Sequence, residues 1–355
     1  MGEHVGSGWV PDETALKAAA EARAAQAAAT KGDARAAMPP RQSTATPVET
    51  SREVPADTAT IRIQTTPEEA ARKAAVLIEA LPWLHRFHDA VVVVKFGGNA
   101  MVDPRLTTTF AQDMAFLRFA GLRPVVVHGG GPQITRALNE REIPSEFRGG
   151  YRVTTEAAIG VVRDVLVNEV AQGIVASLAQ YGGLGAGIPG DEYGMLKGVK
   201  KGVMVGDEYV DLGFVGEVTR VNPAPIHTVL DSGRIPVIST IALEQDGDGR
   251  LNVNADSAAA AIAVALGAEK LIILTDVAGL YADWPNRDSI VSHIGSAELR
   301  RMLPTLESGM IPKMQACLDA VEGGVPKAAI IDGRQEHSVL LEVFTDTGIG
   351  TEVVR

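Results

Sequence analysis

The chain has 355 residues, of which 46% are hydrophobic and 22% charged, enough for one large domain or two lobes with a buried core. Its formal net charge of −11 argues against binding to nucleic acid or to an anionic membrane as the main function. The single cysteine, Cys317, excludes an intrachain disulfide and a cysteine-based zinc site, and it suits a reducing compartment. Because the sequence has neither an apolar run of membrane-spanning length nor a secretory signal, we expect a cytoplasmic protein.

The N-terminal part differs in composition from the rest. Residues 1–60 are rich in Ala and then in Pro, Ser and Thr, and they nearly lack large apolar side chains. Such a segment cannot offset the entropy lost on ordering, so the composition predicts a disordered extension.

A helix is predicted within residues 61–89. Thr66 and Glu69 form a capping box around Pro67, and Pro82 is expected to kink or break the helix after about four turns. Two interpretations of the helix stay open, one in which it packs on its own domain and one in which it is an arm that docks on another subunit. Both rest on a stripe of apolar residues at helical spacing, namely Ala70, Ala74, Leu77, Leu81 and Leu84.

From residue 90 onward, apolar β-runs alternate with helical stretches. The β-runs are AVVVVKFGG, RPVVVHGGG, IPVIST, KLIILTD, KAAIID and a final LLEVF, and the helices are expected near 104–120, 132–141, 256–267 and 296–323. This alternation predicts an α/β fold, a three-layer α/β/α sandwich around a mainly parallel sheet. Residues 198–222 alternate differently, with glycine-containing turns, and predict a hairpin lid or edge.

Two glycine turns follow β-runs, KFGG at residues 95–98 and HGGG at residues 128–131. The carboxyl edge of a parallel sheet is where ligands bind, and glycine lets backbone N–H groups approach an anion, to which Lys95 adds a charge. Either turn alone could be a tight connection that needs positive φ. Together they indicate two acceptor-rich groups bound side by side.

Other polar residues are placed near the same edge. Arg152 in GGYRVT suits a bidentate grip on a carboxylate, although a surface arginine is the commoner case. Asn254 or Asp256 is the expected cap of an Ala-rich helix.

The sequence contains no P-loop motif for nucleotide binding. Its one GxGxxG, at residues 185–190, is rejected as a dinucleotide site because Pro189 and the residues after it open no helix.

Seven motifs together carry a family resemblance: KFGGNAM, VVHGGGPQI, GGYRVT, LNVNADSAAAAIA, LTDVAGLY, GMIPKMQACLDA and FTDTGIGT. In this order, from about residue 65 to the C-terminus, they resemble the N-acetyl-L-glutamate kinases of the amino-acid kinase family, of the arginine-inhibited, hexameric type. The resemblance implies an acetylglutamate-binding lobe (90–245) and a nucleotide-binding lobe (246–355) that ends in an arginine-site segment. It also implies that residues 61–89 are the oligomerisation helix of a homohexamer, a trimer of dimers.

The activity implied by the resemblance is phosphoryl transfer from ATP, with Mg²⁺, to the γ-carboxylate of N-acetyl-L-glutamate in arginine biosynthesis, inhibited by L-arginine. A carboxylate nucleophile needs no general base, so catalysis has to come from positioning and from neutralising the transferred group.

The resemblance also assigns residues. It implies that Lys95 and Lys313 flank the phosphoryl group and that Asp256 holds both lysines, with no protein ligand to the metal. Further roles by motif are backbone contacts to phosphate from Gly97, Gly98 and Gly131, substrate binding by Gly130, Gly131, Arg152 and Asn252, nucleotide binding by Thr275 and Asp276, and arginine binding by Trp83, Glu342 and Gly348.

Some positions depart from the family pattern. Tyr151 replaces a usual Leu, the loop GIPGDE (187–192) differs from the common form and is assigned nothing, and Trp83 stands where inhibited relatives usually have Tyr. By sequence alone Glu342 could equally be a solvated charge beside an edge strand.

Two alternative functions stay open: a kinase of aspartate or glutamate, and a non-catalytic hexameric sensor of arginine or nucleotide.

Overall fold

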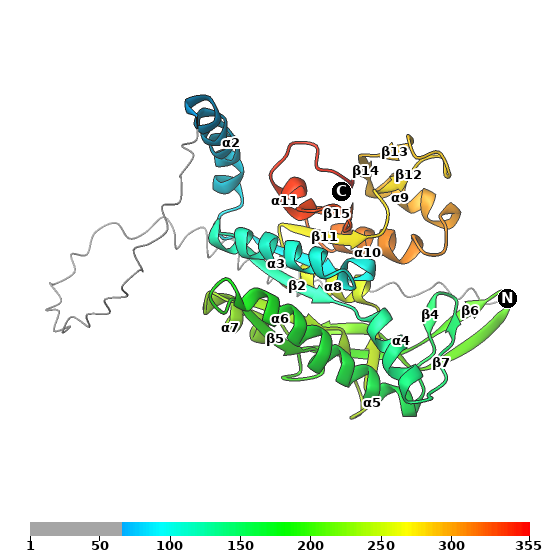
Figure 1. Cartoon of the computed structure of the whole chain (residues 1–355). Coiled ribbons are helices and arrows are strands. Elements are labelled where there is room, and N and C mark those ends of the chain that lie inside the picture. Colours follow the sequence, from blue (N-terminus) through cyan, green and yellow to red (C-terminus); the bar gives the residue numbers. More distant parts are fainter. Residues whose placement is uncertain (1–65) are drawn as a thin grey trace, which may run out of the picture. The chain divides into compact units, whose positions relative to one another are not determined.

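The computed structural model describes residues 66–355, so the extension predicted for residues 1–60 lies outside the described residues. Residues 82–355 belong to one compact body (Figure 1). Its strands are β1 (Val91–Phe96), β2 (Arg123–His128), β3 (Phe147–Arg148), β4 (Tyr151–Arg152), β5 (Gly185–Pro189), β6 (Leu196–Val205), β7 (Glu208–Val221), β8 (Ile235–Ser239), β9 (Ile241–Glu244), β10 (Arg250–Val253), β11 (Lys270–Thr275), β12 (Leu280–Tyr281), β13 (Ile290–Val291), β14 (His293–Gly295), β15 (Lys327–Asp332) and β16 (Thr351–Val354).

The α-helices of the described chain are α2 (Pro67–Arg86), α3 (Pro104–Phe119), α4 (Gly131–Glu140), α5 (Glu156–Asp164), α6 (Ala171–Ala179), α7 (Ala224–Asp231), α8 (Ala255–Ala265), α9 (Ser296–Met302), α10 (Ile311–Glu322) and α11 (Ser338–Val343). Short 3₁₀ turns, η1 (Gly98–Met101) and η3 (Leu303–Thr305), and a π-helical turn, η2 (Val165–Val170), complete the list.

An eight-stranded sheet forms the centre of the body, in the order β14-β16-β15-β11-β1-β2-β8-β5. All neighbouring strands are parallel except β15 and β16, which are antiparallel. The predicted mainly parallel α/β sheet is therefore confirmed. In this register Lys95 lies opposite Val127 of β2 and Ile273 of β11, so the turns after these three strands meet at one edge.

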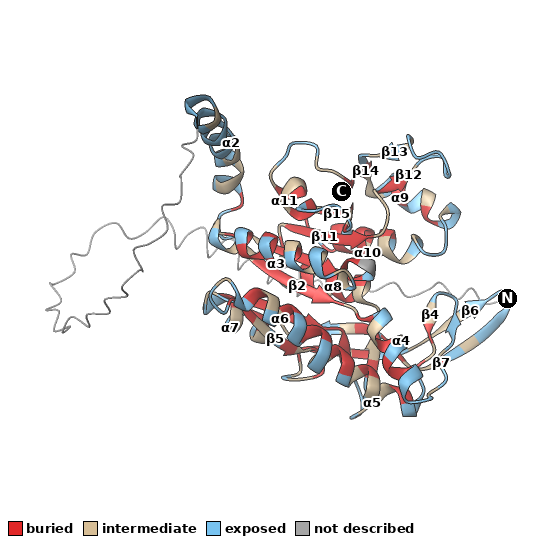
Figure 2. Cartoon of the chain, viewed as in Figure 1, coloured by how far each residue is buried: buried red, intermediate tan, exposed pale blue. Residues whose placement is uncertain are grey.

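Two hydrophobic clusters cover the two faces of the sheet, and β1 contributes to both. Val93 points into a cluster with α7, α8, α9 and α10, whereas Val92 and Val94 point into one with α3, α4, α5, α6 and α11. This alternation is the two-residue period of a strand that is buried on both faces. The arrangement confirms the three-layer sandwich, with the strands buried between the helices (Figure 2).

Two predicted elements, one strand and one helix, are wrong. The run LLEVF is not the last strand: it belongs to α11, in which Val339 and Val343 are buried one turn apart. A short apolar run does not distinguish a strand from a helix, and the true last strand is β16. In place of the single helix expected over 296–323 there are two, α9 and α10, separated by η3 and a turn. Pro304 and Gly309 interrupt the helical segment between them.

Residues 198–222 form most of the long hairpin β6–β7, as predicted. Instead of being a sheet edge, the hairpin joins β9 and β10 in a small closed barrel. Gly206, with φ of +64°, makes its turn. The barrel positions β10, which leads directly into α8 and the candidate site.

Helix α2 begins as predicted, because the Glu69 N–H donates to the Thr66 hydroxyl at 3.2 Å. The helix is assigned continuously through Pro82 to Arg86, so the expected break at Pro82 is wrong, and a kink there stays a prediction. No residue of α2 is buried, and the apolar side chains of Leu77 and Leu81 are more than half exposed.

Candidate active site

A buried carboxylate between two lysines forms the centre of the site. Lys95 Nζ lies 2.8 Å from Asp256 Oδ1, and Lys313 Nζ lies 3.0 Å from Asp256 Oδ2. Lys95 comes from the end of β1, Asp256 from the first turn of α8 and Lys313 from the first turn of α10. The three predicted catalytic residues, which are far apart in the sequence, therefore meet at one place.

The helix cap explains why Asp256 is available for this role. Asn254 is the N-cap of α8, and its side-chain oxygen accepts hydrogen bonds from the N–H groups of Asp256 (2.8 Å) and Ser257 (3.1 Å). The carboxylate of Asp256 is thus not used for capping and can pair with both lysines. Its position in the first helical turn also places it in the positive field of the α8 dipole.

Charge balance decides the ionisation state of this centre. Burial is the largest single influence and opposes ionisation of Asp256, but the ammonium groups of Lys95 and Lys313 together outweigh it and hold the pKa of Asp256 below its usual value. Two cations around one anion leave one positive charge in surplus. A buried surplus of this kind favours an anionic ligand.

The first glycine turn lies against Lys95 on one side and Asp276 on the other. A Cβ on Gly97 would lie only 2.7 Å from Lys95 Nζ, so the lysine folds back over a bare backbone. Gly98 has φ of +69°, and a Cβ there would lie 3.1 Å from Asp276 Oδ1. Position 98 therefore needs glycine, and a side chain at position 97 would displace the ammonium group of Lys95. Strand β11, which ends at the buried Thr275, neighbours β1 in the sheet.

The second glycine turn leads into α4. A Cβ on Gly130 would lie 2.9 Å from Leu166, whereas the space around Gly131, the first residue of α4, is open. His128 before the turn is fully buried, and burial lowers its pKa to about 4, so it is neutral and ties the turn through Nδ1 to the Gly129 carbonyl at 2.9 Å. Exposed N–H groups at a helix N-terminus are suited to an anion.

Arg152 lies beside this second turn. Its guanidinium donates to the Gly131 carbonyl at 3.1 Å, to Thr135 Oγ1 at 2.6 Å and to the hydroxyl of Ser145. It also lies 4.6 Å from the centroid of the Phe147 ring. The interpretation of Arg152 as a surface arginine is wrong: it is buried, and burial lowers its pKa.

Asn252 lies on β10, two residues before the cap of α8. Its Nδ2 donates to Thr154 Oγ1 at 3.2 Å, and Thr154 is two residues from Arg152. The predicted substrate residues Arg152 and Asn252 are thereby linked through one side chain. Thr135, Ser145 and Thr154 were missed by sequence reasoning, and only Thr154 lay within a motif, GGYRVT.

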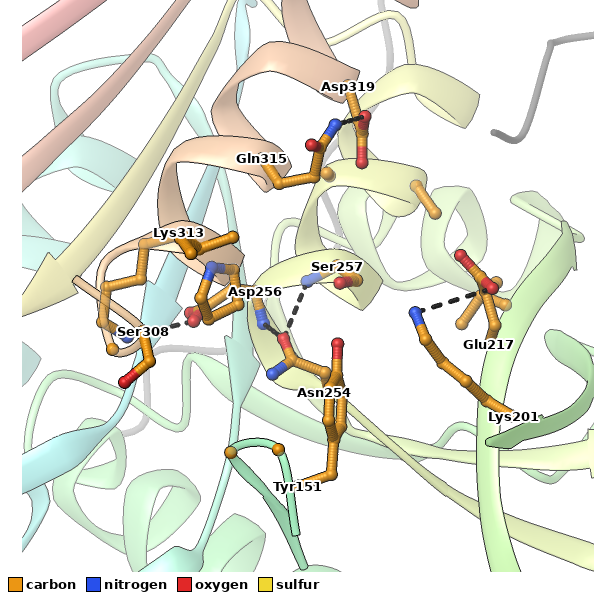
Figure 3. A pocket seen from close by; sticks show the side chains of 18 of the residues that line it. Tyr151, Lys201, Glu217, Asn254, Asp256, Ser257, Ser308, Lys313, Gln315 and Asp319 are labelled. Atoms are coloured by element: carbon orange, nitrogen blue, oxygen red, sulfur yellow. Dashed lines mark hydrogen bonds and ion pairs between the residues drawn. The ribbon is translucent and has the colours of Figure 1, made fainter. Parts of the chain in front are cut away.

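A cavity of about 500 Å³ adjoins the lysine–aspartate centre (Figure 3). Asp256 and Lys313 line it together with the β3–β4 turn, β6, β7, α8 and the residues before α10. Lys201 of β6 pairs with Glu217 of β7 at 3.6 Å across its wall and lies 5.4 Å from the Tyr151 ring. No motif pointed to Lys201, because only the barrel brings the hairpin to this cavity.

Two of the predicted arginine-site residues, Glu342 and Gly348, lie together. Glu342 on α11 is buried, lies 2.7 Å from Lys270 Nζ and accepts from the Ile349 N–H at 2.9 Å. Gly348 adjoins it, since a Cβ there would lie 2.3 Å from Glu342 Oε2. The alternative in which Glu342 is a solvated charge beside an edge strand is therefore wrong. Trp83 contacts its own segment, stacking on Phe87 with 6.2 Å between ring centroids, under the guanidinium of Arg86.

Within residues 66–355, no group of three or more His, Cys, Asp and Glu side chains is arranged to hold a metal ion. In the same part of the chain no helix has the length and apolar character needed to cross a membrane.

A central parallel sheet whose edge carries two glycine turns and a surplus of buried positive charge defines a class of phosphoryl-transfer enzymes. Residues 90–332 match the family described as the amino acid kinase family. In fold, the chain resembles the N-acetylglutamate synthase of Neisseria gonorrhoeae complexed with coenzyme A and N-acetyl-glutamate, with a TM-score of 0.69 and 25% identity. That comparison covers 79% of this chain and 63% of the synthase, so the chain spans less than two thirds of it.

Sequence relatives narrow the class. The chain is 62% identical to the acetylglutamate kinase of Leifsonia xyli over 285 residues, which are 80% of this chain and 94% of that protein. It is 63% identical to the acetylglutamate kinase of Clavibacter michiganensis, over 81% of this chain and 95% of that protein. It is 54% identical to the acetylglutamate kinase of Streptomyces coelicolor, over 80% of this chain and 93% of that protein. The chain belongs to the acetylglutamate kinases of the amino acid kinase family.

Proposed function

We propose that the chain transfers the γ-phosphoryl group of ATP to the γ-carboxylate of N-acetyl-L-glutamate in arginine biosynthesis, and that L-arginine inhibits it. The observation that carries the catalytic part is the buried Asp256 between Lys95 and Lys313, next to a cavity of about 500 Å³. The relatives named acetylglutamate kinase support the choice of N-acetyl-L-glutamate over aspartate or glutamate.

Catalysis rests on charge. Lys95 and Lys313 approach the transferring phosphoryl group from either side and neutralise the negative charge on its oxygens. Asp256 remains ionised and holds both ammonium groups in place, so no reorganisation is needed during the reaction. Because the nucleophile is already a carboxylate, none of these three residues has to move a proton.

The acetylated amino acid binds at the second glycine turn. Arg152 takes the α-carboxylate, replacing its hydrogen bonds to the hydroxyls of Thr135 and Ser145 with a bidentate, charge-assisted pair. Gly130 and Gly131 approach the ligand through their backbone, and Asn252 binds it through its amide. Residues 90–245 form this acetylglutamate-binding lobe, to which Asn252 is added from β10.

The nucleotide binds to the lobe of residues 246–355, with its phosphates at the first glycine turn (residues 95–98) of the other lobe. Gly97, Gly98 and Gly131 direct backbone N–H groups toward phosphate, and Thr275 and Asp276 contact the nucleotide. A Mg²⁺ ion would accompany the phosphates of ATP. The ion would supply further neutralisation of phosphate charge.

Regulation involves a second place in the chain. L-arginine binds with its guanidinium or ammonium group on Glu342, near the backbone of Gly348, and Trp83 stacks over it.

Helix α2 joins subunits of a cytoplasmic homohexamer, a proposal supported by the exposure of Leu77, Ile78 and Leu81.

The test is ADP release with Mg-ATP and N-acetyl-L-glutamate, compared with aspartate and glutamate, with and without L-arginine. Turnover of the acetylated acid alone, suppressed by arginine, is the expected result. Turnover of aspartate or glutamate instead would overturn the substrate, and turnover without arginine sensitivity would overturn the inhibitor site. Absence of turnover, together with calorimetric binding of arginine, would favour a non-catalytic sensor.

A further inference from the structure

Thr154 lies between two residues that are proposed to bind the substrate. It is fully buried, its hydroxyl donates to the Arg152 carbonyl at 3.2 Å, and its oxygen accepts from Asn252 Nδ2, also at 3.2 Å. Arg152 is on β4 and Asn252 on β10, elements separated by about a hundred residues of sequence. One hydroxyl group therefore connects the two sides of the proposed acetylglutamate site.

The backbone of Thr154 is itself fixed to the barrel. Its N–H donates to the Leu212 carbonyl at 3.0 Å, and its carbonyl accepts from the Phe214 N–H at 2.7 Å. Gly213 between them has φ of +70°, and a Cβ there would lie 2.4 Å from the Thr154 carbonyl oxygen. Because β7 approaches this closely, the Thr154 hydroxyl has little freedom to move.

This geometry determines which end of the Asn252 amide a ligand meets. The Arg152 carbonyl can only accept, so it takes the one hydroxyl proton of Thr154, and the hydroxyl oxygen is left as an acceptor. Asn252 must then turn its NH₂ group toward Thr154. Its Oδ1, a neutral acceptor, is consequently the end of the amide available to a ligand.

We propose that Thr154 is a positioning residue that fixes the Asn252 amide so that Oδ1 accepts a hydrogen bond from the acetamido N–H of the substrate. The proposal rests on the proposed function. A reversed amide would set the two N–H donors of Asn252 against the substrate N–H, a donor–donor contact that weakens binding. The orientation thus contributes to the recognition of an N-acylated amino acid.

The first experiment compares Thr154→Val, which keeps the shape and removes the hydroxyl, with Thr154→Ser, which keeps the hydroxyl. We expect Thr154→Val to raise the KM for N-acetyl-L-glutamate about tenfold, the scale of one hydrogen bond, with much smaller changes in kcat and in the KM for ATP. Thr154→Ser is expected to restore most of the affinity, which a purely structural loss of packing would not do.

Thr351→Val is the matched control. Thr351 is equally buried, but it lies on β16. Its hydroxyl accepts a hydrogen bond from the Leu280 N–H at 2.8 Å and donates one to the Val291 carbonyl at 2.5 Å. The Thr351→Val variant should have a lower melting temperature but an unchanged KM for N-acetyl-L-glutamate. If Thr154→Val lowers only the melting temperature, as this control does, the proposal is wrong.

A double-mutant cycle with Asn252→Ala shows whether Thr154 acts through Asn252. In the Asn252→Ala background, Thr154→Val should leave the KM for N-acetyl-L-glutamate nearly unchanged. If the two effects multiply instead, Thr154 does not act through Asn252 and this proposal alone fails. If Asn252→Ala by itself leaves that KM unchanged, the proposed substrate role of Asn252 fails as well. Should Thr154→Val not fold, Thr154→Ala replaces it in the same cycle.

Discussion

Two lysine–carboxylate clusters in this chain differ in the ratio of cations to anions. At the active site two lysines, Lys95 and Lys313, share one carboxylate, Asp256. In the second cluster one lysine, Lys270, is shared by two carboxylates, lying 2.7 Å from Glu342 and 3.2 Å from Glu352. The first cluster borders the cavity, whereas none of the second cluster's members is among the residues that line it.

The difference indicates how an ion cluster that attracts an anion can be told from one whose own charges balance. Buried charges must be paired, and in the second cluster Lys327 also pairs with Glu352 at 2.9 Å, so positive and negative charges balance. At the candidate active site two lysines instead share one carboxylate. We expect an anionic ligand at this excess of positive charge beside the cavity.

Replacing a lysine in each cluster tests this comparison, and we expect the largest effect from Lys95→Met. Loss of one preorganised positive charge should lower kcat by about 10²–10³. Lys270→Met should affect kcat far less but should destabilise the fold by about 3–5 kcal/mol, because it leaves the buried Glu342 without its cation. Steady-state kinetics and thermal unfolding of both variants measure the two effects. Equal losses of kcat would show that the surplus charge at the active site is not what drives catalysis.

The next largest effect is expected from Arg152→Lys. A lysine keeps the charge but cannot make the bidentate contact, so the KM for N-acetyl-L-glutamate should rise about 10–100-fold, the range of a charge-assisted hydrogen bond. Saturation curves with the acetylated acid measure it. Arg136→Lys, a change of an exposed arginine on α4 that pairs with Glu169, is the matched control and should leave this KM unchanged. An unchanged KM in Arg152→Lys would remove Arg152 from the substrate site.

The sequence predicted the fold and the centre of the site well, for a physical reason. Buried parallel strands are continuous apolar runs, and their carboxyl ends meet at one edge, so the positions of Lys95 and the glycine turns follow from the strand pattern. Asp256 and Lys313 had weaker local signals, and the order of the family motifs assigned them. The structure then brought all three within ion-pair distance.

What the sequence did not predict depends on contacts between distant segments. Glu342 looked like a strand residue because the period of a short apolar run is ambiguous, and Lys270, its partner, gave no signal of its own. The role of the β6–β7 hairpin was missed because a closed barrel is a tertiary property. The same holds for Thr135 and Ser145, whose hydroxyls become meaningful only once Arg152 lies between them.

A smaller effect should separate the two carboxylates of the second cluster. We expect Glu342→Gln to raise the arginine concentration needed for half-inhibition about tenfold, since it removes the charge that pairs with the inhibitor. Glu352→Gln alters the same cluster at the neighbouring position on β16 and should change arginine inhibition much less. Inhibition curves at fixed substrate concentrations make the comparison. Equal shifts in both variants would mean that the cluster acts through stability and that Glu342 is not an inhibitor ligand.

The smallest effect extends the comparison to a third buried carboxylate, Asp113 on α3. Its partner is a single half-exposed histidine, His337, at 2.7 Å, and burial outweighs that contact and raises the pKa of Asp113 from 3.8 to about 6. Asp256, with two lysines, is shifted in the opposite direction. The number of cationic partners, and not burial alone, therefore sets the direction of the shift.

For an acid whose pKa is raised on folding, the stabilising contribution is complete below the unfolded value of 3.8 and is lost as the pH rises through the folded value of about 6. Between pH 5 and 6.5 Asp113 should thus cost the protein about 1 kcal/mol of stability, or a few °C in melting temperature. Asp113→Asn does not titrate, so its melting temperature should fall less, or rise more, than that of the unchanged protein over this interval. Calorimetric melting curves at both pH values measure this. Parallel pH dependences of the two proteins would show that Asp113 is ionised throughout, and that one histidine stabilises a buried carboxylate as well as two lysines do.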